Sequence, residues 1–349
     1  MESLGLVDTT PSGGGVRWRV FERGGRVLML LSDQKPDFVQ GLSLYLPLRR
    51  LACLVVKGLV SFPMARRVLP SISLEVDDQG ACGKILVEMK VSPLSFLFGN
   101  PDQRERRAIM LCRAADESLQ VAKIGVSTEA REKVSCEAEL LSKLKSDLPE
   151  AASIPPLLGR WKGDRWDAFQ LPFFQTSRRQ EWTMSELVKI LKTWVSGEKS
   201  DAFLKGDPWK GIECRLEDEE AGEARSLELA PSLRHGDFTP WNILESADSE
   251  PVVIDWEFAG FDSIPGWDLV HFICMSSHLV EQVSKEATLQ KVKRVLREDP
   301  DVRGYLKQVG WSGHEDLLLK SYLLMMGGQL EGFLELLPSW QSLGNGGES

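Results

Sequence analysis

The chain has 349 residues, of which 42% are hydrophobic and 27% are charged. This composition is that of an ordinary globular protein and excludes collagen-like, coiled-coil and disordered chains. The 42 Lys and Arg residues against 51 Asp and Glu residues leave a net charge of −9. So acidic a chain is not expected to bind nucleic acid, which requires a basic surface. The length favours two domains.

Cysteine and histidine usage indicates the compartment and argues against a structural metal site. The six cysteines form no C-x-x-C pair and there are only four histidines, so a structural zinc site is not expected. Scattered cysteines in a chain of this length fit a reducing environment. The first residues lack a basic stretch followed by an apolar run, so we predict no signal peptide and a cytoplasmic protein.

Residues 1–90 are predicted to form an N-terminal extension that combines a β-hairpin with a basic amphipathic segment. Two apolar runs flank Gly24-Gly25 within residues 16–32, which is typical of a hairpin, and residues 71–76 alternate like a strand. Residues 41–70 carry five basic and no acidic side chains. This segment is too interrupted to span a membrane. It is either an ordinary surface helix or a site of peripheral contact with an anionic membrane or an acidic partner.

The next part of the chain is predicted to be rich in strands. Strands are expected over 94–98, 108–114 and 119–124, followed by a strand pair within 160–174. A helix is expected over 129–146, because its apolar residues recur at spacings of three and four. Glu137 falls within that apolar stripe and therefore points inward, where a carboxylate needs a partner.

The remainder of the chain is predicted to be mainly helical. Helices are expected over 183–205, 278–298 and 313–336, with an acid-rich connection over 213–228. A β-rich part with one helix thus precedes a helical part, which defines an α+β fold class.

The segment 231–272 contains the residues that suggest chemistry. It includes His235-Gly236-Asp237, then Asn242, and then Asp255 at the end of an apolar strand. Such residues suit phosphoryl transfer from a metal-bound nucleotide, which depends on charge stabilisation and positioning. Asp237 is placed to accept or orient a hydroxyl proton, and the oxygens of Asn242 and Asp255 suit Mg²⁺. A hairpin joining the strands after Asn242 and before Asp255 would bring these two residues to the same end.

This pattern resembles the catalytic and metal-binding loops of the aminoglycoside phosphotransferase and choline kinase family, which shares the protein-kinase fold. The resemblance covers about residues 94–335 and extends to Lys123 and Glu137, which resemble the family's ion pair that steers the lysine onto the nucleotide phosphates. It implies a two-lobed protein-kinase-like fold, with a β-rich N-lobe over 91–175 and a mainly helical C-lobe over 176–349.

The resemblance also implies roles for individual residues. Lys123, Glu137 and Gly99 would bind the nucleotide, with Gly99 in the turn that covers the phosphates. Asn242 and Asp255 would bind Mg²⁺, and Asp237 would be the catalytic residue. His235 and Asp268 would support the loop that carries Asp237. The sequence of residues 236–242 is similar to that of a bacterial branch of phosphotransferases and differs from that of the antibiotic-resistance enzymes.

The function that follows is transfer of the γ-phosphoryl group of Mg·ATP, with GTP not excluded, to a hydroxyl of a small molecule such as an amino alcohol, a sugar or an aminoglycoside. Two alternatives remain open. One is a non-catalytic kinase-like binding module. The other is a kinase that acts on a macromolecular or membrane-linked acceptor, docked through residues 41–70.

Three groups near the proposed site have two interpretations each. Trp241, Trp256 and Trp267 either cage a cationic substrate or pack beneath the catalytic loop. The arginines that follow Gly99 either meet phosphate or face solvent: Arg104, Arg106 and Arg107. The acidic residues within 217–223 either attract a cationic acceptor or form a solvated loop.

Overall fold

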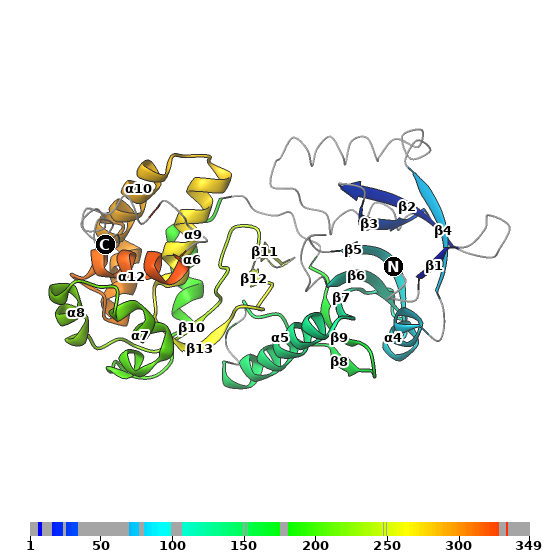
Figure 1. The fold of residues 1–349 in the computed structure, drawn as a ribbon, viewed down its shortest axis with the longest axis horizontal. Coiled ribbons are helices and arrows are strands. Elements are labelled where there is room, and N and C mark those ends of the chain that lie inside the picture. Colours follow the sequence, from blue (N-terminus) through cyan, green and yellow to red (C-terminus); the bar gives the residue numbers. More distant parts are fainter. Residues whose placement is uncertain are drawn as a thin grey trace, which may run out of the picture. The chain divides into compact units, whose positions relative to one another are not determined.

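The chain divides into two compact units, which are described separately here (Figure 1). A computed structural model describes residues 6–8, 16–23, 26–33, 70–76, 80–98, 107–148, 151, 153–174, 181–246, 248, 250–327 and 333. The first unit, called the sheet unit below, spans 1–147 and 154–176. The second, called the helical unit, spans 148–153 and 177–349.

The sheet unit is built on one antiparallel sheet, to which all nine of its described strands belong. The strands are β1 (Leu6–Asp8), β2 (Val16–Arg23), β3 (Arg26–Ser32), β4 (Ser71–Val76), β5 (Val91–Phe98), β6 (Ala108–Ala114), β7 (Leu119–Gly125), β8 (Gly159–Lys162) and β9 (Asp167–Pro172). Their order across the sheet is β1-β4-β2-β3-β5-β6-β7-β9-β8. The predicted strands and strand pair of this part are therefore confirmed.

The first strands of the chain extend this same sheet. The predicted hairpin of residues 16–32 is present as β2 and β3, and β3 pairs with β5. The short strand predicted over 71–76 is β4, which pairs with β2. The basic segment 41–70 lies outside the described residues except for Pro70, so both interpretations of it remain predictions.

Two helices accompany the sheet in the described part of this unit, and the longer one positions a buried carboxylate. They are α4 (Ala81–Met89) and α5 (Thr128–Asp147). The second packs against β7 and β9 through the predicted apolar stripe (Figure 1). Its buried residues include Val134, Ala138, Leu141 and Leu144. Glu137 is only 1% exposed within this stripe, so the prediction that it points inward is confirmed.

The helical unit contains most of the described helices together with two small two-stranded sheets. Its helices are α6 (Met184–Lys192), η3 (Ala202–Lys205), α7 (Asp207–Glu213), α8 (Asp218–Arg225), α9 (Trp267–Met275), η4 (Ser276–Val280), α10 (Lys285–Glu298), α11 (Pro300–Val309) and α12 (Glu315–Met326). Its strands are β10 (Ser232–Arg234), β11 (Ile243–Glu245), β12 (Pro251–Val253) and β13 (Gly260–Ser263). The pairs β10–β13 and β11–β12 are antiparallel.

Large aromatic side chains fill the core of this unit. Five tryptophans are almost completely buried: Trp194, Trp209, Trp256, Trp267 and Trp311. The indole rings of Trp194 and Trp256 meet edge to face, with their centroids 5.2 Å apart. Burial of such large apolar surfaces is the main stabilising contribution to a helical core of this kind.

Two of the predicted helices end earlier or begin later than expected. The helix predicted over 183–205 stops at Lys192, because Val195 pairs with Ser232 and Gly197 takes a left-handed turn with φ of 77°. The helix predicted over 278–298 begins regularly only at Lys285, where the hydroxyl of Ser284 accepts a hydrogen bond from the N–H of Ala287. Local pairing and capping therefore override the apolar periodicity.

The acid-rich connection predicted over 213–228 is mostly helical. Residues 218–225 form α8, and its first turn carries three acidic side chains. Acids at a helix N-terminus stabilise it by interacting with the helix dipole, and the Glu217–Glu220 capping box adds to this effect. The interpretation of this stretch as a solvated loop is therefore wrong. Within the described part of the chain, no helix combines the length and apolar character required to cross a membrane.

Candidate active site

A buried ion pair occupies the middle of the sheet unit. The Nζ atom of Lys123, on β7, lies 2.6 Å from Oε1 and 2.9 Å from Oε2 of Glu137, on α5. Both side chains are more than nine-tenths buried. The ammonium also lies 5.9 Å from the ring centroid of Phe169, on β9. The structure therefore brings together the two residues that the sequence paired.

Arg107 joins this pair from the start of β6. Its Nη1 atom lies 3.7 Å from Oε2 of Glu137, and its side chain is four-fifths buried. One carboxylate thus faces two cations, the ammonium of Lys123 and the guanidinium of Arg107. Of the three arginines discussed above, Arg107 therefore does not simply face solvent. Gly99, Arg104 and Arg106 lie outside the described residues, so their assignments remain predictions.

In the helical unit, a buried carboxylate anchors the loop that contains Asp237. Oδ2 of Asp268 accepts a hydrogen bond of 2.7 Å from the backbone N–H of His235, and Oδ1 accepts one of 3.0 Å from Gly236. Asp268 belongs to the first turn of α9 and is 6% exposed. Hydrogen bonds from backbone N–H groups to a buried carboxylate are charge-assisted and strong. They hold the loop against the N-terminus of α9.

The imidazole of His235 ties this loop to the strand that follows. Its Nε2 donates to the carbonyl of Ile254 at 3.0 Å, and its Nδ1 accepts from the N–H of Asp237 at 3.2 Å. Burial lowers the pKa of His235 below its ordinary value, and nearby acids including Asp268 only partly oppose that shift. The ring is therefore a neutral connector, which agrees with the expectation that it holds the loop backbone.

Asp237 receives a donor at each of its carboxylate oxygens. Oδ2 accepts from the Nδ2 amide of Asn242 at 2.9 Å, and Oδ1 lies 3.3 Å from Nε2 of His271. The same Asn242 amide also donates to the carbonyl oxygen of Asp237 at 2.9 Å. The Asp237 side chain is 28% exposed, so it is held on one side and open to solvent on the other.

The predicted hairpin between Asn242 and Asp255 is confirmed. Ile243 pairs with Val253 across β11 and β12, and the N–H of Ile254 donates to the carbonyl of Asn242 at 2.8 Å. The two site residues therefore flank the same end of this hairpin. Asp255 has a φ of 69°, which is the left-handed region that non-glycine residues rarely occupy.

A glycine is required where the Asp237 loop passes the loop after Asp255. Gly236 has a φ of 84°, and a Cβ atom at this position would lie only 2.6 Å from the carbonyl oxygen of Phe258. The backbones of the two loops are thus in direct contact, and a side chain would separate them.

The residues present fit a magnesium ion bound together with phosphate. Both Nδ2 hydrogens of Asn242 are directed at Asp237, which turns its Oδ1 atom away as a neutral oxygen donor. Asp255 adds a carboxylate at the same hairpin end. Among the described residues, no three His, Cys, Asp or Glu side chains cluster as metal ligands. Two protein oxygens completed by phosphate and water are the usual arrangement for Mg²⁺ in phosphoryl transfer.

The three tryptophans near the loop do not form a cage. Trp256 and Trp267 are each 1% exposed, and their indole N–H groups donate to the carbonyl of Val253 and the hydroxyl of Ser321. Their role in core packing is therefore confirmed. Trp241 is half-buried.

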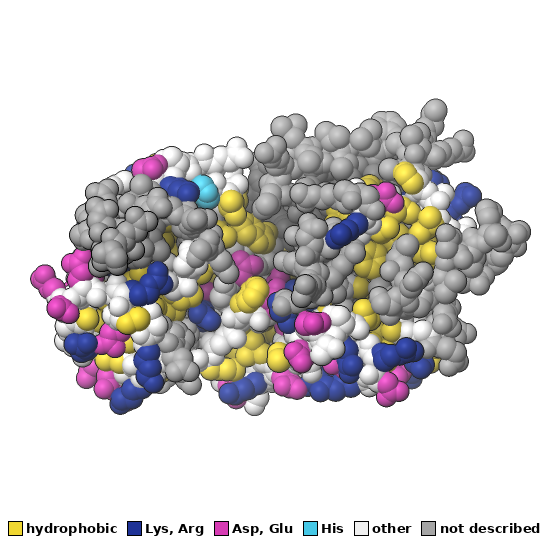
Figure 2. Space-filling model, viewed as in Figure 1, with side chains coloured by type: hydrophobic (Ala, Val, Ile, Leu, Met, Phe, Trp, Pro, Cys, Tyr) yellow, Lys and Arg dark blue, Asp and Glu magenta, His cyan; other side chains and the backbone are white. Residues whose placement is uncertain are grey.

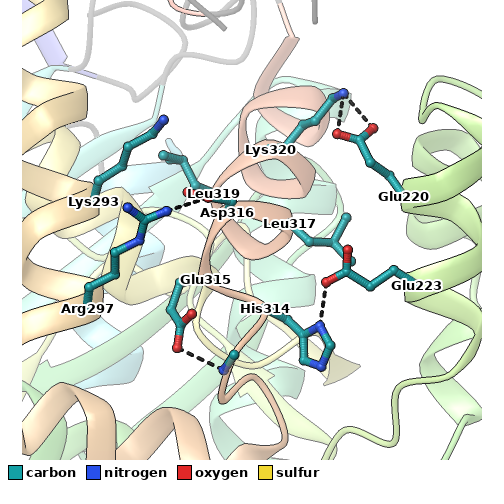
Figure 3. Close-up of a pocket in the computed structure, with 11 residues that line it drawn as sticks. Glu220, Glu223, Lys293, Arg297, His314, Glu315, Asp316, Leu317, Leu319 and Lys320 are labelled. Carbon is teal, nitrogen blue, oxygen red and sulfur yellow. Dashed lines mark hydrogen bonds and ion pairs between the residues drawn. The ribbon is translucent and has the colours of Figure 1, made fainter. Parts of the chain in front are cut away.

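A separate cavity of about 460 Å³ is lined by α8, α10 and α12 (Figure 3). Acidic side chains gather over α8 on the surface of this unit (Figure 2). Around the cavity, however, the acids already have partners. Glu220 binds Nζ of Lys320 at 2.7 and 2.5 Å, and Glu223 binds Nδ1 of His314. A cationic acceptor would have to displace these partners, so the structure offers little support for that interpretation of the acidic stretch.

Sequence reasoning did not identify three contributions to these clusters. They are those of His271, of Tyr322 and of Arg107, which pairs with Glu137. His271 carries one local signal, because it lies three residues after Asp268 in a stretch that is otherwise apolar. Its contacts with Asp237 and Tyr322 span 34 and 51 residues, which local spacing does not reveal.

In the helical unit, the anchored Asp237 loop and the adjacent hairpin end carry residue types that suit a kinase-type phosphotransferase. A model described as the phosphotransferase enzyme family matches residues 137–303, slightly less than half of the chain. This match confirms the resemblance to aminoglycoside phosphotransferases, and with it the α+β, protein-kinase-like fold and the enzyme class. The matched region includes Glu137, the Asp237 loop, Asp255 and Asp268.

Solved structures with related folds share little sequence with this chain. An amicoumacin kinase is 11% identical, with 71% of this chain and 85% of that chain covered and a TM-score of 0.43. An aminoglycoside phosphotransferase from Streptomyces rimosus is 12% identical over 69% and 94%, with a TM-score of 0.41. A protein described as a putative fructosamine-3-kinase from Haemophilus somnus is 13% identical over 74% and 92%, with a TM-score of 0.40. No curated protein matches the chain.

Proposed function

We propose that this enzyme transfers the γ-phosphoryl group of Mg·ATP to a hydroxyl group of a small molecule. The observation that carries the proposal is the carboxylate of Asp237, which is fixed by one donor at each oxygen and remains partly open to solvent. It lies beside Asn242, whose Nδ2 donates to it, and Asn242 and Asp255 flank the same end of the β11–β12 hairpin. These are the parts that phosphoryl transfer requires.

Each residue has a defined task in this reaction. Asp237 orients the acceptor hydroxyl and takes its proton while the new oxygen–phosphorus bond forms and the bond to the β-phosphate oxygen breaks, which releases ADP. Lys123, held by Glu137, binds the α- and β-phosphates. Asn242 and Asp255 would hold Mg²⁺, which neutralises charge on the phosphate oxygens when it is bound.

His235 and Asp268 support this machinery without touching substrate. The two backbone N–H groups bound by Asp268 and the ring bonds of His235 fix the loop that carries Asp237. A loop positioned in this way lowers the cost of ordering the catalytic group during the reaction.

The test is ADP release from Mg·ATP in the presence of pooled alcohols, amino alcohols, sugars and aminoglycosides. An acceptor should raise turnover to roughly 1–100 per second, the usual range of kinases. Asp237→Asn should lower that rate by about 10²–10⁴-fold, the contribution of a general base. Asp316→Asn, which changes an exposed carboxylate of the same unit, is the matched control and should retain the rate.

The metal site is tested by Asp255→Ala in the same assay. Loss of a ligand should remove several kcal/mol of transition-state stabilisation, which corresponds to at least about 10³-fold at ~1.4 kcal/mol per factor of ten. Unchanged metal-dependent turnover would refute the assignment of Asp255. If the wild-type chain releases no ADP with any acceptor, the proposal fails. The better interpretation is then a non-catalytic module or a kinase that acts on a macromolecule.

A further inference from the structure

A buried hydrogen-bond chain runs from α12 to the catalytic carboxylate. The hydroxyl of Tyr322, on α12, lies 2.7 Å from Nδ1 of His271, on α9. The opposite ring nitrogen, Nε2, lies 3.3 Å from Oδ1 of Asp237. Tyr322 is fully buried and His271 is 3% exposed, so water does not compete for these contacts.

An ionised Asp237 defines the direction of the hydrogen bond that it makes with His271. Asp237 must be ionised to take a proton, and an ionised carboxylate only accepts hydrogen bonds. Nε2 of His271 therefore carries the hydrogen. Burial raises the pKa of Tyr322 well above its ordinary value, so its phenol stays protonated. Its hydroxyl can then donate to Nδ1, and in that arrangement the ring carries a single hydrogen, on Nε2.

We propose that His271 is a positioning residue for Asp237, and that Tyr322 fixes the ring form required for this role. The inference rests on the proposed function of Asp237. Together, His271 and Asn242 supply one donor to each carboxylate oxygen. Two such bonds fix the plane of the carboxylate, so its remaining lone pairs point in a constant direction toward the acceptor hydroxyl.

The same arrangement excludes a proton relay through the ring. Nε2 already carries hydrogen, so it cannot receive the proton that Asp237 takes from the acceptor. His271 thus acts through Asp237 and does not exchange protons with the substrate. This role differs from that of His235, whose two ring nitrogens hydrogen-bond to backbone groups of Ile254 and Asp237.

The ring form can be measured without nucleotide or acceptor. Nitrogen-15 NMR of histidine-labelled protein distinguishes the two neutral tautomers and the cation, and His271→Gln identifies the signal among the four histidines. We expect a neutral ring protonated on Nε2 at neutral pH. Tyr322→Phe should shift the Nδ1 signal, whereas Tyr305→Phe, which removes another buried hydroxyl of this unit, should not. A ring protonated on Nδ1, or on both nitrogens, would overturn the proposed chain.

Kinetics test the positioning role. His271→Leu should lower kcat about 10- to 100-fold, the usual effect of losing a hydrogen bond to a charged group, and leave the KM for ATP unchanged. His271→Gln, whose amide can still donate toward Asp237, should recover part of that loss. Tyr322→Phe should lower kcat by about 2- to 10-fold. Tyr305→Phe is the control and should retain the wild-type kcat.

The outcomes separate this inference from the proposed function. An active wild-type enzyme with a folded, fully active His271→Leu variant would overturn only the positioning role. Equal losses in His271→Leu and His271→Gln would also overturn it, because a purely structural defect predicts no rescue. If His271→Leu does not fold, Tyr322→Phe and His271→Gln still decide the question. A wild-type chain that never releases ADP would instead refute the proposed function, while NMR would still decide the hydrogen-bond chain.

Discussion

The Asp237 loop and the cavity beside α12 both concentrate polar groups in the helical unit, but they arrange them in opposite ways. At the loop, the side chains of Asn242 and His271 converge on one carboxylate and leave it partly open. Around the cavity, Glu220, Glu223 and Asp316 each face a basic partner, as in Lys320 with Glu220 (Figure 3).

The difference distinguishes a candidate active site from a structural support. Neutral donors orient a carboxylate and leave its charge available for a substrate, whereas an ion pair consumes the charge that a ligand would need. Size and charge density alone would have favoured the cavity. The pattern of partners favours the loop, and four substitutions test this contrast.

The largest effect is expected at the anchor of the loop. Asp268→Asn replaces one of the two acceptor oxygens with an NH2 group, which cannot accept a hydrogen bond. The backbone N–H of either His235 or Gly236 therefore loses its partner. The free energy of unfolding should fall by about 3 kcal/mol, the upper end of the cost of an unsatisfied buried donor, and kcat should fall with it. Urea denaturation measures the first, with Asp316→Asn as the exposed control. Equal stabilities of the two variants would contradict the anchoring role.

A smaller loss is expected at the cavity. Glu220→Leu leaves the ammonium of Lys320, which is 6% exposed, without this carboxylate. Breaking a buried pair on one side costs about 3–5 kcal/mol, and the partial exposure of Glu220 should reduce this to about 2–3 kcal/mol. The double change Glu220→Leu with Lys320→Met should restore most of the stability and leave kcat unchanged. A large fall in kcat would instead indicate that the cavity takes part in function.

Gly236→Ala tests the contact between the two loops. The left-handed backbone costs alanine about 1–2 kcal/mol, and its Cβ would press on the carbonyl of Phe258. Thermal unfolding should show the modest destabilisation, while kcat falls more than stability alone explains because the loops separate. Gly313→Ala is the control, since Gly313 has a similar φ of 87° but open space around it. Equal kcat values for both variants would show that loop contact is unimportant.

The weakest effect concerns pH. Burial lowers the pKa of His235 in the folded protein, whereas the unfolded chain titrates near the ordinary value of 6.5. As pH falls below about 6.5, only the unfolded state gains a proton, so stability decreases by at most about 1.4 kcal/mol per pH unit until the folded pKa is reached. Urea titrations between pH 7 and 5 should show this slope, and His235→Gln should flatten it. An identical slope in both proteins would exclude His235 as its source.

Much of the sheet unit follows from local patterns. The strand β6 was predicted with its observed bounds, because apolar alternation and flanking turns define strands locally. The inward orientation of Glu137 also followed from periodicity within a single helix. The partner Arg107 did not, because that contact depends on how β6 packs beside α5.

The helical unit was harder to predict where pairing or capping competes with periodicity. The chain leaves α6 because Val195 pairs with Ser232, and the helix α8 was hidden by its high charge. The Asp237 loop and the hairpin after it could be predicted from the sequence, because their residues are close together in the chain. Tyr322 was not, because its role exists only once α12 packs against α9.

The left-handed backbone of Asp255 limits which mutations can remove activity without loss of folding. Such a conformation favours glycine, with asparagine and aspartate as the side chains that tolerate it best. Mutations that preserve folding at this position therefore lead to asparagine or glycine, and both discard the negative charge. Relatives that keep the fold but have lost the chemistry should carry one of these two residues here, whereas a relative with alanine should be both inactive and less stable. The geometry of one residue thus predicts the route by which an active lineage becomes a silent one.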